Sequence, residues 1–200
     1  MFTLPIKPKH SIAPLLVVFC SVLLALTEPL SSEWFAYNRL DISHLQFWRL
    51  ITGHFLHTNL IHLLLNLAGL GLLWALHGHY YQNKQYIIVM LLLCLGTSAG
   101  IYVFSPELQW YVGLSGVLHG LFVLGAYFDI RHHLASGWLL LLGVWIKVLH
   151  EQFYGASQDI AQLIDANVAI DAHLFGTLSG TILILYFLKL HKKRLIHEHE

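Results

Sequence analysis

Six apolar stretches separated by polar links constrain the fold of this chain more than any other feature. Most of these stretches are close in length to the roughly 20 residues that an α-helix needs to cross a bilayer. We therefore predict an all-α, polytopic membrane protein: one domain over residues 1–200, built as a bundle of six transmembrane helices, the fifth of them short. The predicted helices cover residues 11–26, 58–76, 86–104, 112–128, 137–149 and 168–190.

The composition agrees with a membrane-embedded chain and argues against other classes. Of the 200 residues, 56% are hydrophobic and 11% are charged, and the mean hydropathy is +0.63. The formal net charge is zero, so no basic field indicates a nucleic-acid partner. Cys20 and Cys94 lie inside apolar stretches, which favours buried thiols over a disulfide or a zinc site. We therefore predict that the chain is embedded in the lipid bilayer.

The first apolar stretch follows a basic start with Lys7 and Lys9, a pattern that cleaved signal peptides share. We predict a retained helix, because no clean A-x-A cleavage site follows it and five further spans do. Residues 28–53 come next and are too mixed to span a bilayer. We predict an outer loop there, with aromatic rings suited to the water–lipid interface at Trp34, Phe35, Tyr37, Phe47 and Trp48.

The distribution of basic residues predicts the orientation. Six spans put both termini on one side of the membrane, and the opposite side then holds only Arg39 and Arg49. By the positive-inside rule, both termini lie in the cytoplasm. Lysine and arginine on the terminal side are Lys7, Lys9, Lys84, Arg131, Lys189, Lys192, Lys193 and Arg194.

The stretch Val112–Gly120, VGLSGVLHG, places a serine between glycines in apolar sequence. A polar group at such depth is costly unless it has partners. In the predicted topology Ser115 and His173 lie near the outer ends of the fourth and sixth helices. On the second helix, His62 and Asn66 are four residues apart and share a face. We therefore expect a hydroxyl, two imidazoles and an amide to meet in the outer half of the membrane.

Small residues predict that the helices approach closely at the same place. Gly113, Gly116 and Gly120 surround the serine, and Gly176 and Gly180 lie on the histidine face of the sixth helix. Such small-xxx-small faces permit close backbone contact in lipid.

This set of residues suits acyl transfer by a serine nucleophile. The hydroxyl of Ser115 needs a neutral base, and His173 can take its proton and later give it to a leaving amine. The side chains of His62 and Asn66, with the backbone N–H of Ser115, can donate hydrogen bonds to the oxyanion that forms.

No acidic residue is predicted to support the base. Asp171 is two residues before His173 and therefore points to another face of its helix. We predict a Ser–His dyad rather than a triad. His119, one turn after Ser115, either packs against His173 and orients it or is a buried histidine bonded to a neighbouring helix.

At these residues the sequence resembles the rhomboid intramembrane serine proteases. GLSG at Gly113–Gly116 is similar to the family's nucleophile motif, and HTNLIHLLLN at His57–Asn66 has its H-x4-H-x3-N spacing. AHLFGTLSG at Ala172–Gly180 is similar to the base motif H-x2-G-x3-G. The pair Trp48–Arg49 resembles the WR pair of the first outer loop.

The resemblance implies a role for each matching residue. Ser115 is then the nucleophile and His173 the base, while His62, Asn66 and Gly113 line the oxyanion and substrate site. It implies no cofactor and no metal. The supporting residues are His57, a structural histidine that fastens the outer loop, and His119, Gly116, Gly176, Gly180, Trp48 and Arg49.

One departure narrows the resemblance. Many rhomboids carry a tyrosine four residues after the serine, where this chain has His119. In this histidine and in its compact six-helix chain, the protein resembles the rhombosortase subgroup. That resemblance implies substrates with a C-terminal Gly-Gly motif, a transmembrane helix and a basic tail. It also implies a bacterial inner membrane and an active site open to the periplasm.

Cleavage inside a membrane needs local unwinding of the substrate helix, because its backbone amides are otherwise sheltered. The short fifth helix and residues 151–165 are the predicted gate and cap of the site.

Two other functions stay open. His77, His79, His132 and His133, with Asp129 nearby, lie on the predicted cytoplasmic side and would suit a His-ligated metalloenzyme. The third reading is an inactive rhomboid-like protein that binds membrane clients. Such proteins typically lack the serine or the histidine, and this chain has both.

Overall fold

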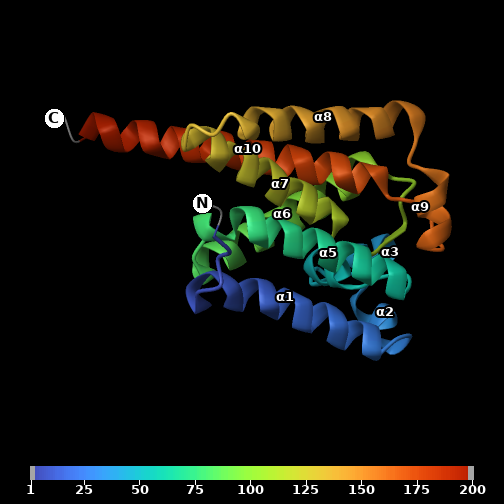
Figure 1. Cartoon of the computed structure of the whole chain (residues 1–200). Coiled ribbons are helices and arrows are strands. Elements are labelled where there is room, and N and C mark those ends of the chain that lie inside the picture. Colours follow the sequence, from blue (N-terminus) through green and yellow to red (C-terminus); the bar gives the residue numbers. More distant parts are fainter. Residues whose placement is uncertain (1–2, 198–200) are drawn as a thin grey trace.

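The computed structural model describes residues 3–197, without the side chains of residues 187 and 189–197. It is mostly helical, as predicted, apart from two strands of two residues each. A long helix lies over each predicted apolar stretch (Figure 1). These helices are α1 (Pro8–Leu26), α5 (Leu60–His77), α6 (Asn83–Phe104), α7 (Ser115–Arg131), α8 (Ser136–Tyr154) and α10 (Ile170–His197).

The prediction of a short fifth helix was wrong. Helix α8 has 19 residues and continues past the expected end at residue 149. Lys147 and Glu151 form an i,i+4 ion pair of 2.9 Å, so the helix can carry both charges. It ends at Tyr154, before Gly155, whose φ of 80° is the left-handed conformation that glycine adopts readily after a helix.

Several helices are long and apolar enough to cross a membrane. They are α1, the segment Leu60–Tyr80 and α6, and Ile170–Tyr186 is a shorter apolar helix. Large apolar side chains stay exposed along the helices, among them Phe19, Leu139 and Ile182. A membrane supplies the apolar surroundings that such surfaces need.

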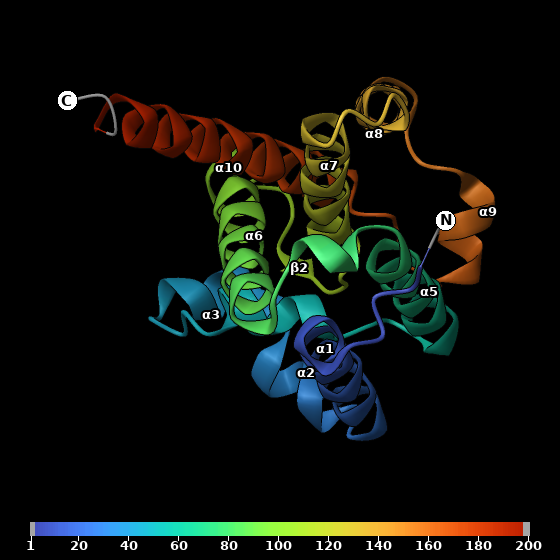
Figure 2. The ribbon, with the colours of Figure 1, turned by 60° about the vertical axis from the view of Figure 1, so that its left-hand side comes forward.

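Helix α7 lies at the centre of the bundle and packs against α10, α8, α5 and α6 (Figure 2). Both described ends of the chain lie at one end of the molecule, and α2, α3 and α9 lie at the other (Figure 1). Helices α5, α7 and α10 begin at that second end, and α8 ends there. The polar residues at these helix ends are therefore brought to one depth.

The closest helix contact is that of α7 with α10. A Cβ atom on Gly176 would overlap the backbone carbonyl of Gly116, and one on Gly180 would lie 2.7 Å from the carbonyl oxygen of Gly120. Only glycine permits this backbone approach, which joins the two helices that carry Ser115 and His173.

The predicted outer loop is a folded segment at the end where α9 lies. Its strand β1 (Tyr37–Asn38) pairs antiparallel with β2 (Trp110–Tyr111), which precedes α7. The loop is therefore joined to the chain that leads into Ser115. The shorter helices are α2 (Leu30–Phe35), α3 (Arg39–Ser43), α4 (Arg49–Thr52), η1 (Gly53–Phe55), η2 (Gly78–Tyr80) and α9 (Gln158–Leu163).

Arg49 holds this segment together. Its buried guanidinium donates to the carbonyl oxygens of Ala36 and Glu33, at 2.8 and 2.7 Å, and pairs with Asp41 at 3.1 Å. Its neighbour Trp48 donates through the indole N–H to a backbone carbonyl of α2, at 3.0 Å. The pair therefore supports the loop and lies outside the cluster around Ser115.

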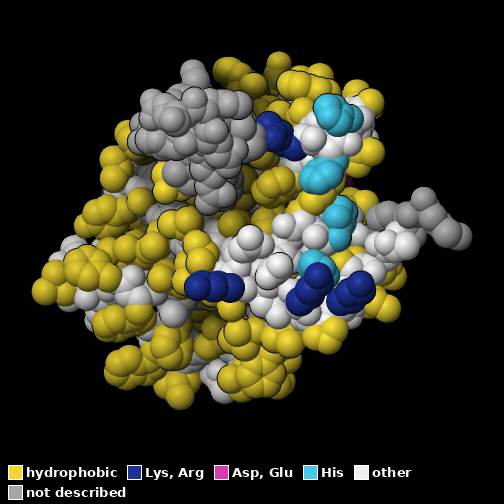
Figure 3. Space-filling model, turned by 90° about the vertical axis from the view of Figure 1, so that its left-hand side faces the viewer, with side chains coloured by type: hydrophobic (Ala, Val, Ile, Leu, Met, Phe, Trp, Pro, Cys, Tyr) yellow, Lys and Arg dark blue, Asp and Glu magenta, His cyan; other side chains and the backbone are white. Residues whose placement is uncertain are grey.

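The end of the molecule with the chain termini differs in charge. Figure 3 shows lysine, arginine and histidine side chains gathered there, with no acidic side chain in view among the described residues. This distribution agrees with the one on which the predicted orientation rests. The side chains of Lys189, Lys192, Lys193 and Arg194, which also entered that prediction, lie outside the described residues.

Candidate active site

Ser115 is the first residue of α7, and the chain before it turns sharply to reach the helix. Gly113 makes this turn with a φ of 123°, which a side chain would disfavour. The turn is held at both ends: the N–H of Gly113 donates to the carbonyl of Gly53 at 3.2 Å, and the hydroxyl of Tyr111 donates to the carbonyl of Gly113. Helix-start N–H groups lack intrahelical partners, so the N–H of Ser115 is available to a ligand.

His173 lies in the first turn of α10 and faces Ser115. Its Nε2 atom is 2.9 Å from the serine Oγ, within hydrogen-bond distance, and its side chain is buried. The structure therefore brings together the two residues that the sequence predicts as nucleophile and base. Asp171 is on another face, as predicted, where it accepts a hydrogen bond from Ser105.

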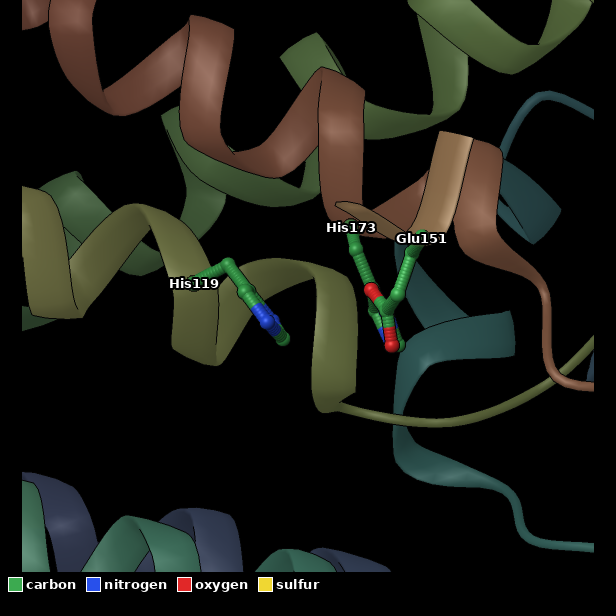
Figure 4. Close-up of side chains that lie close together, drawn as sticks. All are labelled: His119, Glu151 and His173. Carbon is green, nitrogen blue, oxygen red and sulfur yellow. The ribbon is translucent and has the colours of Figure 1, made fainter. Parts of the chain in front are cut away.

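A carboxylate contacts the imidazole of His173, which the sequence did not lead us to expect. Glu151, in the last turn of α8, has an oxygen 2.8 Å from Nδ1 of His173. Figure 4 shows the two side chains next to each other, with His119 extending toward them from α7. The prediction that no acidic residue supports His173 was wrong, because the sequence reading ended the fifth helix too early and assigned Glu151 to a loop.

Lys147 and His119 complete a polar cluster around the base. The ammonium of Lys147 lies 2.9 Å from the Glu151 carboxylate, 2.8 Å from Nε2 of His119 and 3.3 Å from Nδ1 of His173. The ring of His119 stacks on that of His173, with centroids 4.3 Å apart and 20° between the planes. His119 thus packs against His173 and also bonds to a neighbouring helix, so both features that the sequence left as alternatives are present.

The hydrogen-bond partners of His119 determine its tautomer. Nδ1 is 2.7 Å from the carbonyl oxygen of Ser115, which only accepts, so Nδ1 carries the proton. Nε2 then presents a lone pair, which accepts from Lys147. His119 therefore joins the start of α7 to the ammonium on α8.

His62 and Asn66 lie on α5 and face the turn at Gly113, just before Ser115. A Cβ atom added to Gly113 would lie 2.9 Å from Nε2 of His62 and 3.6 Å from Nδ2 of Asn66, so both side chains face this turn. Nδ2 of Asn66 is buried and has no hydrogen-bond partner among the described residues. A buried unpaired donor beside a serine is suited to an oxygen that gains negative charge.

Nδ1 of His62 faces the backbone N–H of Thr58 at 3.4 Å. In the tautomer that accepts this bond, the proton is on Nε2 and points a second donor at the turn. The hydroxyl of Thr58 donates to the carbonyl of Ile164, which ties the start of α5 to the chain after α9.

His57 does not have the expected bond to the outer loop. Both of its ring nitrogens are buried without a hydrogen-bond partner among the described residues, and its ring packs edge to face on that of His62, 5.0 Å away. Burial lowers the pKa of His57 to about 3, so the ring is neutral. Arg49 fastens the loop, and the contact found for the His57 ring is with His62.

Two cavities reach Ser115. One, of about 390 Å³, lies between α5, α7 and α8 and has mostly apolar walls with Asn66, His119 and Lys147 at its polar end. The other, of about 310 Å³, opens beside His62 and is bordered by the chain around Trp110 and the segment after α9. The serine is thus accessible from an apolar side and from a more polar side.

The alternative metal cluster is not assembled. Among the described residues, the histidine and carboxylate ligand atoms that lie within 4.8 Å of one another belong to His119, Glu151 and His173. Toward the other end of α7, the histidines have separate partners: His77 pairs with Asp129 at 3.2 Å, and His132 bonds within its own helix. His79 and His133 are the other two histidines of the predicted metal site. Among the described residues, neither belongs to a group of three close ligand atoms.

Lys147 and Glu151 were the residues that sequence reasoning missed. The available signal was their spacing: a lysine inside a predicted span with a glutamate four residues later, on the same helix face. An ionisable residue at membrane depth needs a partner, and the helix had to continue by one turn to supply it.

The sequence is similar to known proteins of one family. Residues 44–190 match the family model described as "Rhomboid domain". The chain is also 29% identical over 160 residues to the Bacillus subtilis (strain 168) protein named "Putative rhomboid protease YdcA". That match covers 78% of this chain and 74% of the relative.

Proposed function

The chain belongs to the rhomboid family of polytopic membrane proteins, and on this premise we propose that it is an intramembrane serine protease. The single observation that carries the proposal is the 2.9 Å contact between Ser115 Oγ and His173 Nε2. A serine and an imidazole in this contact form an activated nucleophile. The same contact argues against the reading of an inactive client-binding protein, which would need neither group.

The proposed reaction has two steps. Ser115 Oγ attacks the carbonyl carbon of a substrate peptide bond while His173 Nε2 takes the hydroxyl proton. The imidazolium then gives that proton to the amine nitrogen, the C–N bond breaks, and an acyl-enzyme remains. Water attacks the ester in the same way, its proton passing through His173 to Oγ, which releases the carboxylic acid and restores the serine.

The oxyanion of each tetrahedral intermediate would lie near Gly113. The N–H of Ser115, the amide of Asn66 and the imidazole of His62 are the donors available around that position. Because Nδ2 of Asn66 has no hydrogen-bond partner among the described residues, its hydrogen bond would be made only when the oxygen arrives. An interaction gained only in the transition state accelerates the reaction.

The proposed substrates are transmembrane segments of other proteins. The cavity with apolar walls between α5 and α8 is suited to a segment that comes from lipid, and the cavity beside His62 offers water a path to the serine. The segment must unwind to expose a peptide bond, which glycine-rich sequence favours. The finer proposal, cleavage of C-terminal Gly-Gly anchors in the manner of rhombosortases, is supported by His119 and by this preference.

The proposed orientation puts both termini in the cytoplasm and Ser115 toward the periplasm of a bacterial inner membrane. The basic terminal end and the outer segment at the opposite end support it. In this orientation α8 and α9, rather than a short fifth helix, border the site as gate and cap.

The test is cleavage in detergent or liposomes with a fluorescent transmembrane peptide and its Gly-Gly variant. We expect wild-type protein to cleave and to be labelled at Ser115 by a fluorophosphonate, and Ser115→Ala and His173→Ala to do neither. Unchanged cleavage by Ser115→Ala would refute the protease. Equal rates on the peptides with and without Gly-Gly would refute only the rhombosortase specificity.

A further inference from the structure

We propose that Glu151 is a positioning residue for His173, so that α8 supplies a third member to the Ser115–His173 pair. The inference rests on the proposed function and adds a residue to the same site. It concerns a carboxylate outside the three motifs on which the family resemblance depends.

Glu151 fixes the position of the ring proton on His173. A carboxylate oxygen only accepts hydrogen bonds, so its 2.8 Å contact with Nδ1 places the ring proton on Nδ1. Nε2 then has a lone pair directed at Ser115 Oγ, 2.9 Å away. Glu151 thereby selects the tautomer that can accept the serine proton, and the opposite tautomer cannot act as base.

Glu151 also supplies the negative charge that a protonated His173 needs. When His173 takes the proton it becomes a cation in a buried position, which is unfavourable without an anionic partner. Glu151 lies in contact with the ring and is itself largely buried, its side chain 13% exposed. The carboxylate therefore stabilises the imidazolium that forms during the reaction.

Lys147 is a hydrogen-bond donor that competes with Glu151 for Nδ1 of His173. Lys147 has its ammonium 3.3 Å from His173 Nδ1, close enough to donate to that nitrogen if the carboxylate were absent. Donation would move the ring proton to Nε2 and block the base. Glu151 prevents this by accepting from both groups, since the same oxygen is 2.9 Å from the lysine.

The arrangement also links three helices. Glu151 and Lys147 come from α8, His173 from α10, and His119 from α7, so the base is complete only while α8 packs against the other two. A residue that merely stabilised this packing would affect folding. A positioning residue affects the rate of the serine while the protein stays folded.

The decisive variant is Glu151→Gln, which keeps the shape and removes the charge. We expect its rate of fluorophosphonate labelling at Ser115 to fall about 100-fold. For peptide cleavage we expect a similar fall in kcat, with KM within about twofold of wild type. The matched control is Glu33→Gln, which makes the same change at an exposed carboxylate on α2 and should label at the wild-type rate.

A second effect separates positioning from packing. In the Glu151→Gln background, adding Lys147→Met removes the competing donor, and we expect labelling to recover about 10-fold over the single variant. If Glu151→Gln does not fold, the pair Glu151→Asp and Glu151→Asn replaces it. These two have equal length, and the aspartate variant should label faster.

Three outcomes would overturn the inference alone: wild-type labelling by Glu151→Gln, no recovery on adding Lys147→Met, or equal labelling of the aspartate and asparagine variants. Wild-type protein that neither cleaves nor is labelled would overturn the proposed function, and the inference with it. Because the probe needs no substrate, these cases are distinguishable.

Discussion

The imidazole rings of His119 and His173 stack nearly parallel, 4.3 Å apart, so the proposed base is held by a second histidine one turn after the serine. Aromatic stacking of this kind contributes about 1 kcal/mol, or about fivefold in a rate. We expect His119→Ala to lower kcat by about that factor and His119→Phe to retain most of it, as measured with the peptide assay. Equal losses in both variants would show that the contact with Lys147, rather than stacking, is what matters.

Asn66 provides a test of the oxyanion site. Loss of one such donor costs about 3 kcal/mol, or about 100-fold in kcat. Because its Nδ2 has no partner among the described residues, Asn66→Ala should lose this rate without lowering the thermal unfolding temperature. A variant with normal kcat and reduced stability would show instead that the amide is structural.

The glycine contact between α7 and α10 should be intolerant of a methyl group. At Gly176 a Cβ atom would overlap the carbonyl of Gly116, so we expect Gly176→Ala to separate the helices and to lose folded protein. Gly71 on α5 has nothing within 4 Å of its Cβ position, and Gly71→Ala should be as stable as wild type or more stable. The measurement is thermal unfolding in detergent, and equal stability of the two variants would contradict the prediction.

Much of the site follows from helix starts and ends. Ser115, His173, His62 and Asn66 each fall in the first half of an apolar stretch, so the alternating direction of the helices fixes their common depth. Glu151 was missed because a charge was read as the end of a helix, when an i,i+4 partner allowed the helix to continue.

Contacts between segments far apart in the chain could not be predicted from the sequence. The carbonyl groups that Arg49 binds depend on how the outer segment folds, so the sequence did not predict that this side chain fastens the loop. The pairing of β1 with β2 was missed for the same reason, since strands of two residues have no pattern of their own.

Buried neutral histidines at the outer segment should make the fold sensitive to acid. Burial lowers the pKa of His54 to about 4, and that of His57 to about 3. In the unfolded chain each binds a proton near pH 6.5, so below that pH the unfolded state gains protons that the folded state does not. Each histidine should thus reduce the free energy of unfolding by up to about 1.4 kcal/mol per pH unit below 6.5.

We expect the unfolding temperature to fall between pH 7 and pH 5, and His54→Gln to show a weaker fall. The glutamine amide has a donor for the carbonyl of Cys94, which His54 contacts at 3.1 Å. Parallel pH curves for the two proteins would show that another group titrates.

Lys147 should determine whether the site binds metal. Its ammonium lies 2.8–3.3 Å from atoms of His119, Glu151 and His173, three potential ligands within 4.8 Å of one another. Two histidines and a glutamate are a zinc-binding set, and the lysine fills the position that the ion would take. We expect Lys147→Ala to be inhibited by zinc at concentrations that leave wild-type activity unchanged, and EDTA to restore the variant. The ratio of activities with and without zinc is the readout, because the substitution also changes the basal rate. Zinc inhibition of equal strength in both proteins would place the metal elsewhere and contradict this role of the lysine.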